Sequence, residues 1–251
     1  MTAASAPPRL APELLALFHQ VSTATVSSVL HKHGIDHATM YDVLPLRPDL
    51  RLAGQAFTLR FIPMREDLDD RATIDNLTNK QRLAVESVAP GDVLVIDARG
   101  DTRAATLGSI LATRVRQRGG AGIVTDGAFR DSPSFRSLEL PTYARGQHPD
   151  ISFMVHHPSE IGVPIACGGV AVLPGDVIVG DAEAVMVVPL ALAETVAQEA
   201  IEQERREIFI LARVAAGASI VGTYPPDDNT LREYEAWRAQ HGANAHVPSS
   251  A

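Results

Sequence analysis

Two short apolar segments in the middle of the chain, separated by one helix-length segment, constrain the fold more than any other feature. Val93–Asp97 and Gly122–Thr125 are rich in β-branched residues and predict two buried strands. The residues between them, from about Ala104 to Arg118, predict a helix that ends at Gly119 and Gly120. A strand–helix–strand unit favours a parallel pair of strands with a right-handed crossover. We therefore expect an α/β fold built around a parallel sheet.

Further helices and strands are predicted on both sides of this unit. The Pro-Gly-Asp-Val turn at residues 90–93 recurs at 174–177, and we interpret it as repeated turn chemistry because the flanking segments differ. Residues Ala191–Ala216 predict one long amphipathic helix. The other predicted elements are helices at Glu13–His19 and Thr25–His33 and strands at Phe57–Ile62 and Val185–Val188.

The 251 residues are enough for one domain with a sizeable core, and no segment reads as a linker. We expect residues 1–20 to form a leader and a short helix, and residues 21–222 to form the main domain. Residues 223–251 predict a C-terminal extension that is partly disordered, from about Gln240 onwards.

Composition and charge exclude several classes of partner. A net charge of −8 argues against a nucleic-acid groove, so we expect no nucleic-acid partner. No apolar run approaches the roughly 18 residues of a membrane span, so we expect no membrane partner. The first residues do not resemble a signal peptide, and Cys167 is the sole cysteine, which excludes an intrachain disulfide. We expect a cytoplasmic protein in which Cys167 is a small buried residue.

The absence of common motifs narrows the candidate chemistry. The chain has no GxGxxG, Walker, GxSxG, CxxC or HExxH motif. What remains is the segment after the second central strand, Asp126–Asp131, which we expect to form a loop. Ligands of α/β sheets gather at the carboxyl ends of strands, where this loop must lie. Arg130 offers a planar fork for a carboxylate, and Asp131 is a hard ligand suited to Mg²⁺ or Mn²⁺.

The segment Gly108–Leu111 is expected near the same edge of the sheet. If the amino end of its helix is exposed there, its backbone N–H groups can hold an anion. Taken alone, the pair Arg130–Asp131 is weak evidence for a site and favours an ordinary salt-bridged loop.

The motif blocks of this chain resemble those of the RraA-like and 4-hydroxy-4-methyl-2-oxoglutarate aldolase family. The family pattern is a helix-opening glycine motif followed by G-x-x-G-h-h-x-D-G-x-x-R-D, where h is hydrophobic. The corresponding residues here are Gly108–Ala112, Gly119–Gly127 and Arg130–Asp131. Weaker blocks lie at residues 23–27, 54–58, 174–181 and 187–189, so the resemblance spans roughly residues 20 to 210.

The resemblance implies a layered αββα core with a long C-terminal helix, assembled as a homotrimer or as a hexamer. It also implies a divalent-metal lyase acting on a small 2-oxo acid, as an aldolase or an oxaloacetate decarboxylase, with Mg²⁺ or Mn²⁺ as cofactor. Carried over by position, Arg130 binds the 2-oxo acid and balances the charge of the enolate, and Asp131 holds the metal. The backbone of Gly108, Ser109, Ile110 and Leu111 binds the substrate carboxylate.

The lysine content agrees with a metal-dependent route. Cleavage beside a 2-oxo acid leaves an enolate, which a Schiff-base lysine or a Lewis-acid metal can stabilise. Lys32 and Lys80 are the only lysines, and neither lies in the motif. One departure concerns Ser109, because many aldolases of the family have Asp or Glu there to assist proton transfer. Asp101 or a carboxylate from another subunit is the candidate substitute.

Two alternative functions follow from the same resemblance. Enolate stabilisation also serves elimination, so a sugar-acid dehydratase could use the same Arg130–Asp131 platform. The family also includes regulators that inhibit a ribonuclease by protein–protein contact without catalysis, which a net charge of −8 does not exclude.

Overall fold

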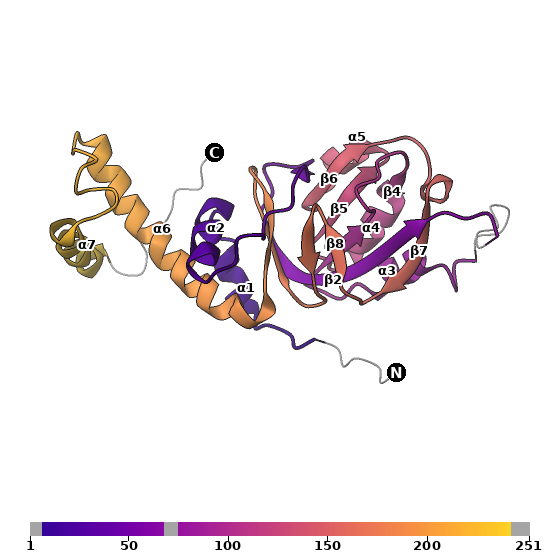
Figure 1. Cartoon of the computed structure of the whole chain (residues 1–251), viewed down its shortest axis with the longest axis horizontal. Helices are drawn as coiled ribbons and strands as arrows, with labels where there is room; N and C mark the ends of the chain where they lie inside the picture. The colour runs from indigo at the N-terminus through magenta and orange to yellow at the C-terminus, as the bar shows by residue number, and fades with distance from the viewer. Residues whose placement is uncertain (1–6, 68–74, 242–251) are drawn as a thin grey trace.

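A computed structural model describes residues 7–67 and 75–241 as a curved mixed sheet, with one group of helices over its central strands and a second group at its β10–β11 end (Figure 1). The large sheet has the strand order β1-β6-β5-β3-β2-β10-β11, with β4 added to β5 and β7 added to β2. Its strands are β1 Leu44–Pro45, β2 Leu52–Pro63, β3 Asp92–Asp97, β4 Ala105–Leu107, β5 Gly122–Phe129, β6 Thr142–Gln147, β7 His156–Ile161, β10 Val177–Gly180 and β11 Val185–Val188. The strands β8 Ile165–Cys167 and β9 Val170–Val172 form a second, two-stranded sheet.

The helices of the described residues fall into two groups. The first group comprises α3 Lys80–Ser87, α4 Ser109–Gln117 and α5 Ser132–Ser137. The second comprises α1 Pro12–Phe18, α2 Thr23–Lys32, α6 Ala193–Ala215 and α7 Asp228–His241. Short 3₁₀ turns lie at Ser152–Met154 (η1) and Leu190–Leu192 (η2). The predicted α/β class and the long C-terminal helix are confirmed.

The centre of the sheet is parallel, as the strand–helix–strand pattern predicts. Strand β3 pairs in parallel with both β2 and β5, and β5 pairs in parallel with β6. Both faces of β3 are buried: Leu94 packs with α3 and α4, while Val93 packs with β8 and β9. Burial on both faces explains why the central strands are continuously apolar and do not alternate. Their carboxyl ends meet at one edge of the sheet, which is where the candidate site lies.

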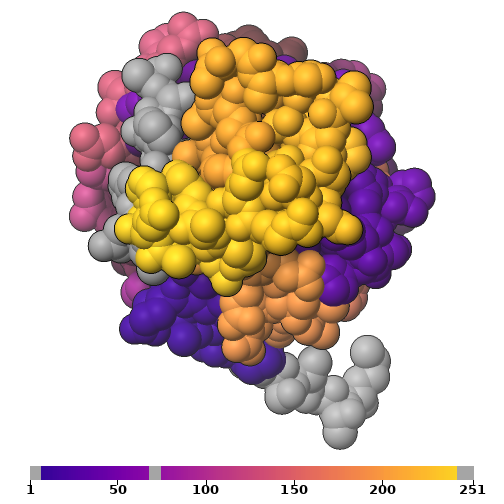
Figure 2. Space-filling model, turned by 90° about the vertical axis from the view of Figure 1, so that its left-hand side faces the viewer, coloured from indigo at the N-terminus to yellow at the C-terminus, as the bar shows by residue number. Residues whose placement is uncertain are grey.

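The long helix α6 leaves the sheet and extends beyond the body of the molecule (Figure 1). Its first turns pack with α1 and α2 against β10 and β11, through residues such as Val196 and Ala200. At its far end Phe209 and Ile210 pack against Tyr234 of α7. Seen from this end, α6 and α7 form the orange and yellow face of the molecule (Figure 2). None of the helices in the described ranges is long and apolar enough to cross a bilayer.

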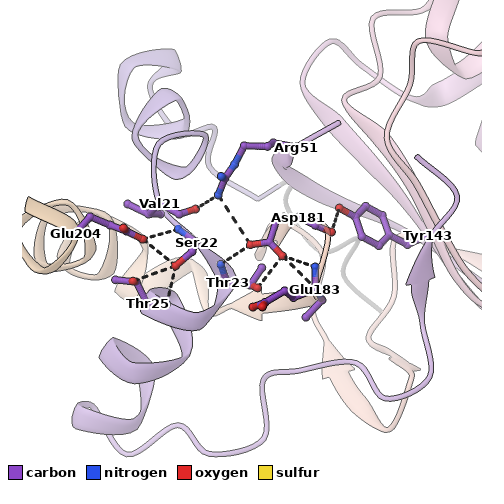
Figure 3. A network of polar contacts seen from close by, with 10 residues as sticks. Val21, Ser22, Thr23, Thr25, Arg51, Tyr143, Asp181, Glu183 and Glu204 are labelled. Atoms are coloured by element: carbon purple, nitrogen blue, oxygen red, sulfur yellow. Dashed lines mark hydrogen bonds and ion pairs between the residues drawn. The ribbon is translucent and has the colours of Figure 1, made fainter. Parts of the chain in front are cut away.

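A polar network fixes α2 between the sheet and α6 (Figure 3). The side chain of Asp181, in the turn between β10 and β11, accepts hydrogen bonds from the Thr23 amide at 2.8 Å and the Thr23 hydroxyl at 2.9 Å. Ser22 caps α2 by accepting from the Thr25 amide, and its own amide donates to Glu204 of α6 at 2.7 Å. One short segment therefore ties the start of α2 to two elements more than 150 residues away in the sequence.

Three predicted boundaries are wrong. Residues Ala105–Leu107 form a strand and not the start of a helix, because they pair with the end of β5 and the Thr106 hydroxyl donates to the Ala128 carbonyl. Asp126–Phe129, expected as a loop, continue β5, and the buried Asp126 carboxylate accepts from the Ala98 and Gly100 amides. Gln240 and His241, expected to be disordered, lie in α7, and the rest of that predicted disorder, residues 242–251, lies outside the described residues.

His156 of β7 is fully buried and stacks on Phe61, with ring centroids 5.3 Å apart. Its Nδ1 lies 3.3 Å from a guanidinium nitrogen of Arg99, and its Nε2 lies 3.2 Å from the Ala104 carbonyl. A neutral ring with the proton on Nε2 satisfies both contacts, because Nδ1 then accepts and Nε2 donates. Burial lowers the pKa of His156, and the nearby cations Arg99 and Arg103 act in the same direction.

We expect the free energy of unfolding to decrease as pH falls from about 7 to about 5. The unfolded state takes up a proton near pH 6.5, whereas the folded state resists it, so the stability contributed by neutral His156 is complete above pH 6.5 and is lost below it. His156→Gln should lower stability at pH 7 by about 1–3 kcal/mol and flatten its decline in acid. Urea unfolding at both pH values tests this, and an unchanged slope in the variant would contradict it.

Candidate active site

The candidate residues follow the ends of two adjacent parallel strands and therefore lie close together. Strand β4 ends at Leu107 and leads through Gly108 into α4, and β5 ends at Phe129 and leads directly into Arg130 and Asp131. The strands pair in parallel, with Leu107 beside Phe129, and the Arg130 amide donates to the Leu107 carbonyl at 3.2 Å. The site therefore lies at the carboxyl ends of strands, where α/β sheets bind ligands.

Asp131 takes a left-handed backbone conformation, with φ 61° and ψ 37°. Aspartate is one of the few residues that tolerate this conformation. The turn aims the carboxylate at the start of α4, where Oδ2 accepts hydrogen bonds from the Ser109 amide at 3.1 Å and the Ser109 hydroxyl at 3.2 Å. These bonds, together with the Arg130 guanidinium, lower the pKa of Asp131. Asp131 is therefore ionised at neutral pH.

Arg130 lies beside this carboxylate but forms no short, charge-assisted hydrogen bond with it. Its Nε is 3.5 Å from Asp131 Oδ1, longer than an ordinary charge-assisted hydrogen bond of about 2.7–2.9 Å. The two side chains are 38% and 36% exposed, so both can reach a ligand from solvent. The arrangement differs from a closed salt bridge such as Arg47–Asp49, in which two guanidinium nitrogens, Nε and Nη2, each donate to one carboxylate oxygen.

Position 108 requires glycine because the side chains of Arg130 and Asp131 lie too close to its backbone to leave room for a Cβ atom. A Cβ atom at this position would lie 2.7 Å from Asp131 Oδ2 and 2.9 Å from Arg130 Cγ. The backbone of Gly108 is extended, with φ −118° and ψ −178°, so the requirement is for space and not for an unusual conformation. The helix-opening glycine thus lets the strand end, the helix start and the Arg-Asp turn meet.

A cavity of about 150 Å³ opens at this point. Its lining includes Gly108, Ile110, Leu111, Arg130 and Asp131, and Ser109 contacts Asp131, so the structure brings all six predicted residues together. The amides of Ile110 and Leu111 belong to the first helical turn, which has no intrahelical carbonyl to bind. They are available to an anion, as is the positive end of the α4 dipole. The cavity thus combines donors for a carboxylate with one ionised carboxylate.

The sequence analysis did not predict the residues that line the rest of this cavity, away from the motif. Gln81 and Arg82 from α3, and Ile151, Ser152 and Phe153 from around η1, also line it. These residues precede or follow the motif blocks, and no local pattern shows which part of the sheet α3 covers.

The cavity offers a divalent cation one charged oxygen ligand from the described residues. No cluster of three or more His, Cys, Asp or Glu residues that could hold a metal occurs within residues 7–67 and 75–241. Mg²⁺, however, keeps several waters and is often held by one or two carboxylates together with its substrate. Asp131 is a hard, ionised and partly exposed oxygen ligand in an open cavity, so it fits a hydrated Mg²⁺ or Mn²⁺.

Comparison with known proteins identifies relatives of this chain. The model of the RraA-like family, described as Aldolase/RraA, matches residues 23–187. A protein of Halalkalibacterium halodurans named "Putative 4-hydroxy-4-methyl-2-oxoglutarate aldolase" is 34% identical over 208 residues, covering 81% of this chain and 91% of that protein. A 4-hydroxy-4-methyl-2-oxoglutarate aldolase of Thermus thermophilus is 32% identical over 139 residues, covering 55% of this chain and 76% of its own.

Solved structures show the same relationship. RraAS2 of Streptomyces coelicolor, titled an unusual member of the RNase ES inhibitor RraA protein family, superposes with a TM-score of 0.73 at 36% identity. The match covers 81% of this chain and 98% of that one. The chain belongs to the RraA-like (Aldolase/RraA) family.

Proposed function

We propose that this protein is a divalent-metal lyase that cleaves a carbon–carbon bond of a 2-oxo acid, as an aldolase or an oxaloacetate decarboxylase. The observation that carries the proposal is the open juxtaposition of Arg130 and Asp131 at the amino end of α4. The names of the relatives that share most of this chain support the substrate class.

Each protein group has a distinct task in this proposal. The amides at the start of α4 bind the substrate carboxylate, and the planar guanidinium of Arg130 binds the 2-oxo acid beside it. When the bond breaks, negative charge develops on the substrate oxygen, and Arg130 is placed to stabilise it. Asp131 would hold a divalent cation, which supplies Lewis-acid polarisation of the substrate oxygens.

The proton-transfer group is the unusual part of the site. The Ser109 hydroxyl donates a hydrogen bond to Asp131, and a hydroxyl is neutral at pH 7, so Ser109 is not a general base. Asp101 is not a replacement within this chain. It is absent from the cavity lining, and a hydrogen bond from Arg103 lowers its pKa to about 2. Among the described residues that line the cavity, Asp131 is the only carboxylate and none is a histidine, so we expect the base to come from the substrate, from water or from a second subunit.

Ser109→Asp is expected to raise the rate of pyruvate release. The substitution places a carboxylate at the first turn of α4, where the helix dipole favours it and where it can take part in proton transfer. Because general acid–base catalysis contributes typically about 10²–10⁴-fold, we expect a gain of at least about 10-fold in kcat. Ser109→Asn is the matched control of equal size. No gain, or an equal gain in both variants, would place the base elsewhere.

The experiment that tests the function measures pyruvate release from oxaloacetate and from 4-hydroxy-4-methyl-2-oxoglutarate. We expect turnover with Mg²⁺ or Mn²⁺ and its loss in EDTA. Turnover that EDTA leaves unchanged, or none on either substrate with metal, would contradict the proposal.

A second candidate function is regulation of a ribonuclease. It is favoured by the likeness to RraAS2, whose title places it in an RNase ES inhibitor family. Binding to an immobilised ribonuclease and inhibition of its cleavage test this function. We expect the Asp131→Asn variant to separate the two functions, because it should lose turnover and keep any inhibition by surface contact.

A further inference from the structure

Arg82 is the one charged residue, among the described residues of the cavity, that the proposed reaction leaves without a task. The charged residues that line the cavity within the described ranges are Arg82, Arg130 and Asp131. Arg82 lies in the first turn of α3, where its amide donates to Asn79 Oδ1 at 3.2 Å. The neighbouring Gln81 side chain donates to the Thr106 carbonyl and to the Ser152 hydroxyl, which fixes the start of α3 against β4 and η1. The base of the Arg82 side chain is therefore held rigidly at the wall of the cavity.

The guanidinium of Arg82 lacks a protein counter-charge in the part of the chain that the structure describes. Its Nε is buried and has no hydrogen-bond partner, and no described carboxylate forms an ion pair with it. Most other arginines near this region are paired, as Arg114 is with Glu86 at 2.8 Å. Burial without a partner lowers the pKa of Arg82, because the surroundings disfavour its charged form. A bound anion would reverse that effect and complete the hydrogen bonds of the fork.

The charges of the cavity exceed what a monocarboxylic acid can balance. Arg82 and Arg130 contribute two positive charges, and Asp131 contributes one negative charge that a divalent cation would more than offset. The amino end of α4 adds further positive potential. One carboxylate bound by Arg130 and α4 still leaves Arg82 unpaired. The cavity, at about 150 Å³, is smaller than the roughly 300–1,000 Å³ of pockets for drug-sized ligands, so it suits a small acid.

We propose that Arg82 is a specificity-determining residue that binds the second carboxylate of a dicarboxylic 2-oxo acid. In this arrangement the 2-oxo acid end lies against Arg130 and the start of α4, and the far carboxylate lies against α3. The inference rests on the proposed function for the identity of the first subsite. Arg82 would then make the protein prefer dicarboxylic substrates over monocarboxylic substrates of equal length.

The test uses two unreactive ligands that differ only at the far end, 2-oxoglutarate and 2-oxopentanoate. Binding is measured by calorimetry in the presence of Mg²⁺. We expect the wild-type protein to bind 2-oxoglutarate about 10–100-fold more tightly, the range typical of a charge-assisted pair. Arg82→Gln should remove this preference by weakening 2-oxoglutarate alone, and Arg82→Lys should restore part of it. Arg114→Gln, which removes a positive charge outside the cavity lining, is the control and should keep the full preference.

Three outcomes would overturn the inference. They are equal binding of the two ligands by the wild-type protein, equal weakening of both ligands by Arg82→Gln, and loss of the preference in Arg114→Gln. The binding assay and the assay of pyruvate release give independent results, because binding does not depend on turnover. Failure of the lyase proposal can therefore be distinguished from failure of this inference. A wild-type protein that prefers 2-oxoglutarate through Arg82 but releases no pyruvate from any 2-oxo acid refutes the reaction and retains this subsite.

Discussion

Asp131→Asn is expected to abolish metal-dependent pyruvate release while leaving the fold intact. The substitution removes the only carboxylate among the described residues that line the cavity, and with it the only charged oxygen ligand that they offer a cation. A Lewis-acid cation contributes several kcal/mol of transition-state stabilisation, so we expect kcat/KM to fall by at least about 10³-fold. Asparagine tolerates the left-handed conformation at φ 61°, and its Oδ1 can still accept from Ser109, so stability should change by less than about 1 kcal/mol.

The matched control is Asp49→Asn. Asp49 also pairs with an arginine, Arg47, but lies on the surface outside the cavity lining. We expect wild-type kinetics for this variant. If both variants lose activity together, or if Asp131→Asn retains it, Asp131 is not the metal ligand and the pair is an ordinary salt bridge.

Gly108→Ala is the second substitution with a large expected effect, and it leaves every charged group in place. The added methyl group would lie 2.7 Å from Asp131 Oδ2 and 2.9 Å from Arg130 Cγ, so both side chains must move. A misplacement of about 1 Å in a reacting group can lower the rate about 10²-fold, and we expect a loss of that order in kcat/KM. Because both displaced side chains are partly exposed and can move toward solvent, the melting temperature should change little.

Gly146→Ala provides the comparison for this prediction. Gly146 lies in β6, and a Cβ atom there would be 3.5 Å from its nearest neighbour, an ordinary van der Waals contact. It should therefore retain full activity. Equal kinetics of the Gly108→Ala and wild-type proteins would show that the close approach around Gly108 has no catalytic consequence.

Much of the fold could be predicted from the sequence because burial imposes a simple pattern. Strand β3 is buried on both faces, which makes its residues continuously apolar and recognisable. The predicted parallel pairing of β3 with β5 is confirmed by the register of Val93 with Gly122. The start of α6, predicted at Ala191, is observed two residues later, within the usual uncertainty of helix ends.

The parts that could not be predicted depend on contacts between distant segments. Strand β4 is three residues long, and it exists because β5 continues past Thr125 and offers it a partner. Strand β5 itself continues through Asp126 because that carboxylate satisfies backbone amides of the β3–β4 connection. The local strand propensity of these residues does not predict either contact. The two errors therefore have one cause, a strand pair formed between segments more than 20 residues apart.

The candidate site also has a part that the sequence predicts and a part that depends on contacts between distant segments. Its motif residues, from Gly108 to Asp131, could be proposed from spacing and resemblance, and the structure places them around one cavity. Arg82 could not, because only the docking of α3 against β4 brings it to the wall. The unpaired state of its guanidinium is likewise a property of the folded surroundings and not of the sequence near it.

Binding of Mn²⁺ to the wild-type and Asp131→Asn proteins, followed by electron paramagnetic resonance, tests the central claim most directly because it needs no substrate and no turnover. We predict that the wild-type protein removes the signal of free Mn²⁺ with saturation at a single site per chain. The variant should bind at least about 10-fold more weakly, as expected when a ligand of the cation is lost. Equal binding by the two proteins would contradict a metal site at Asp131.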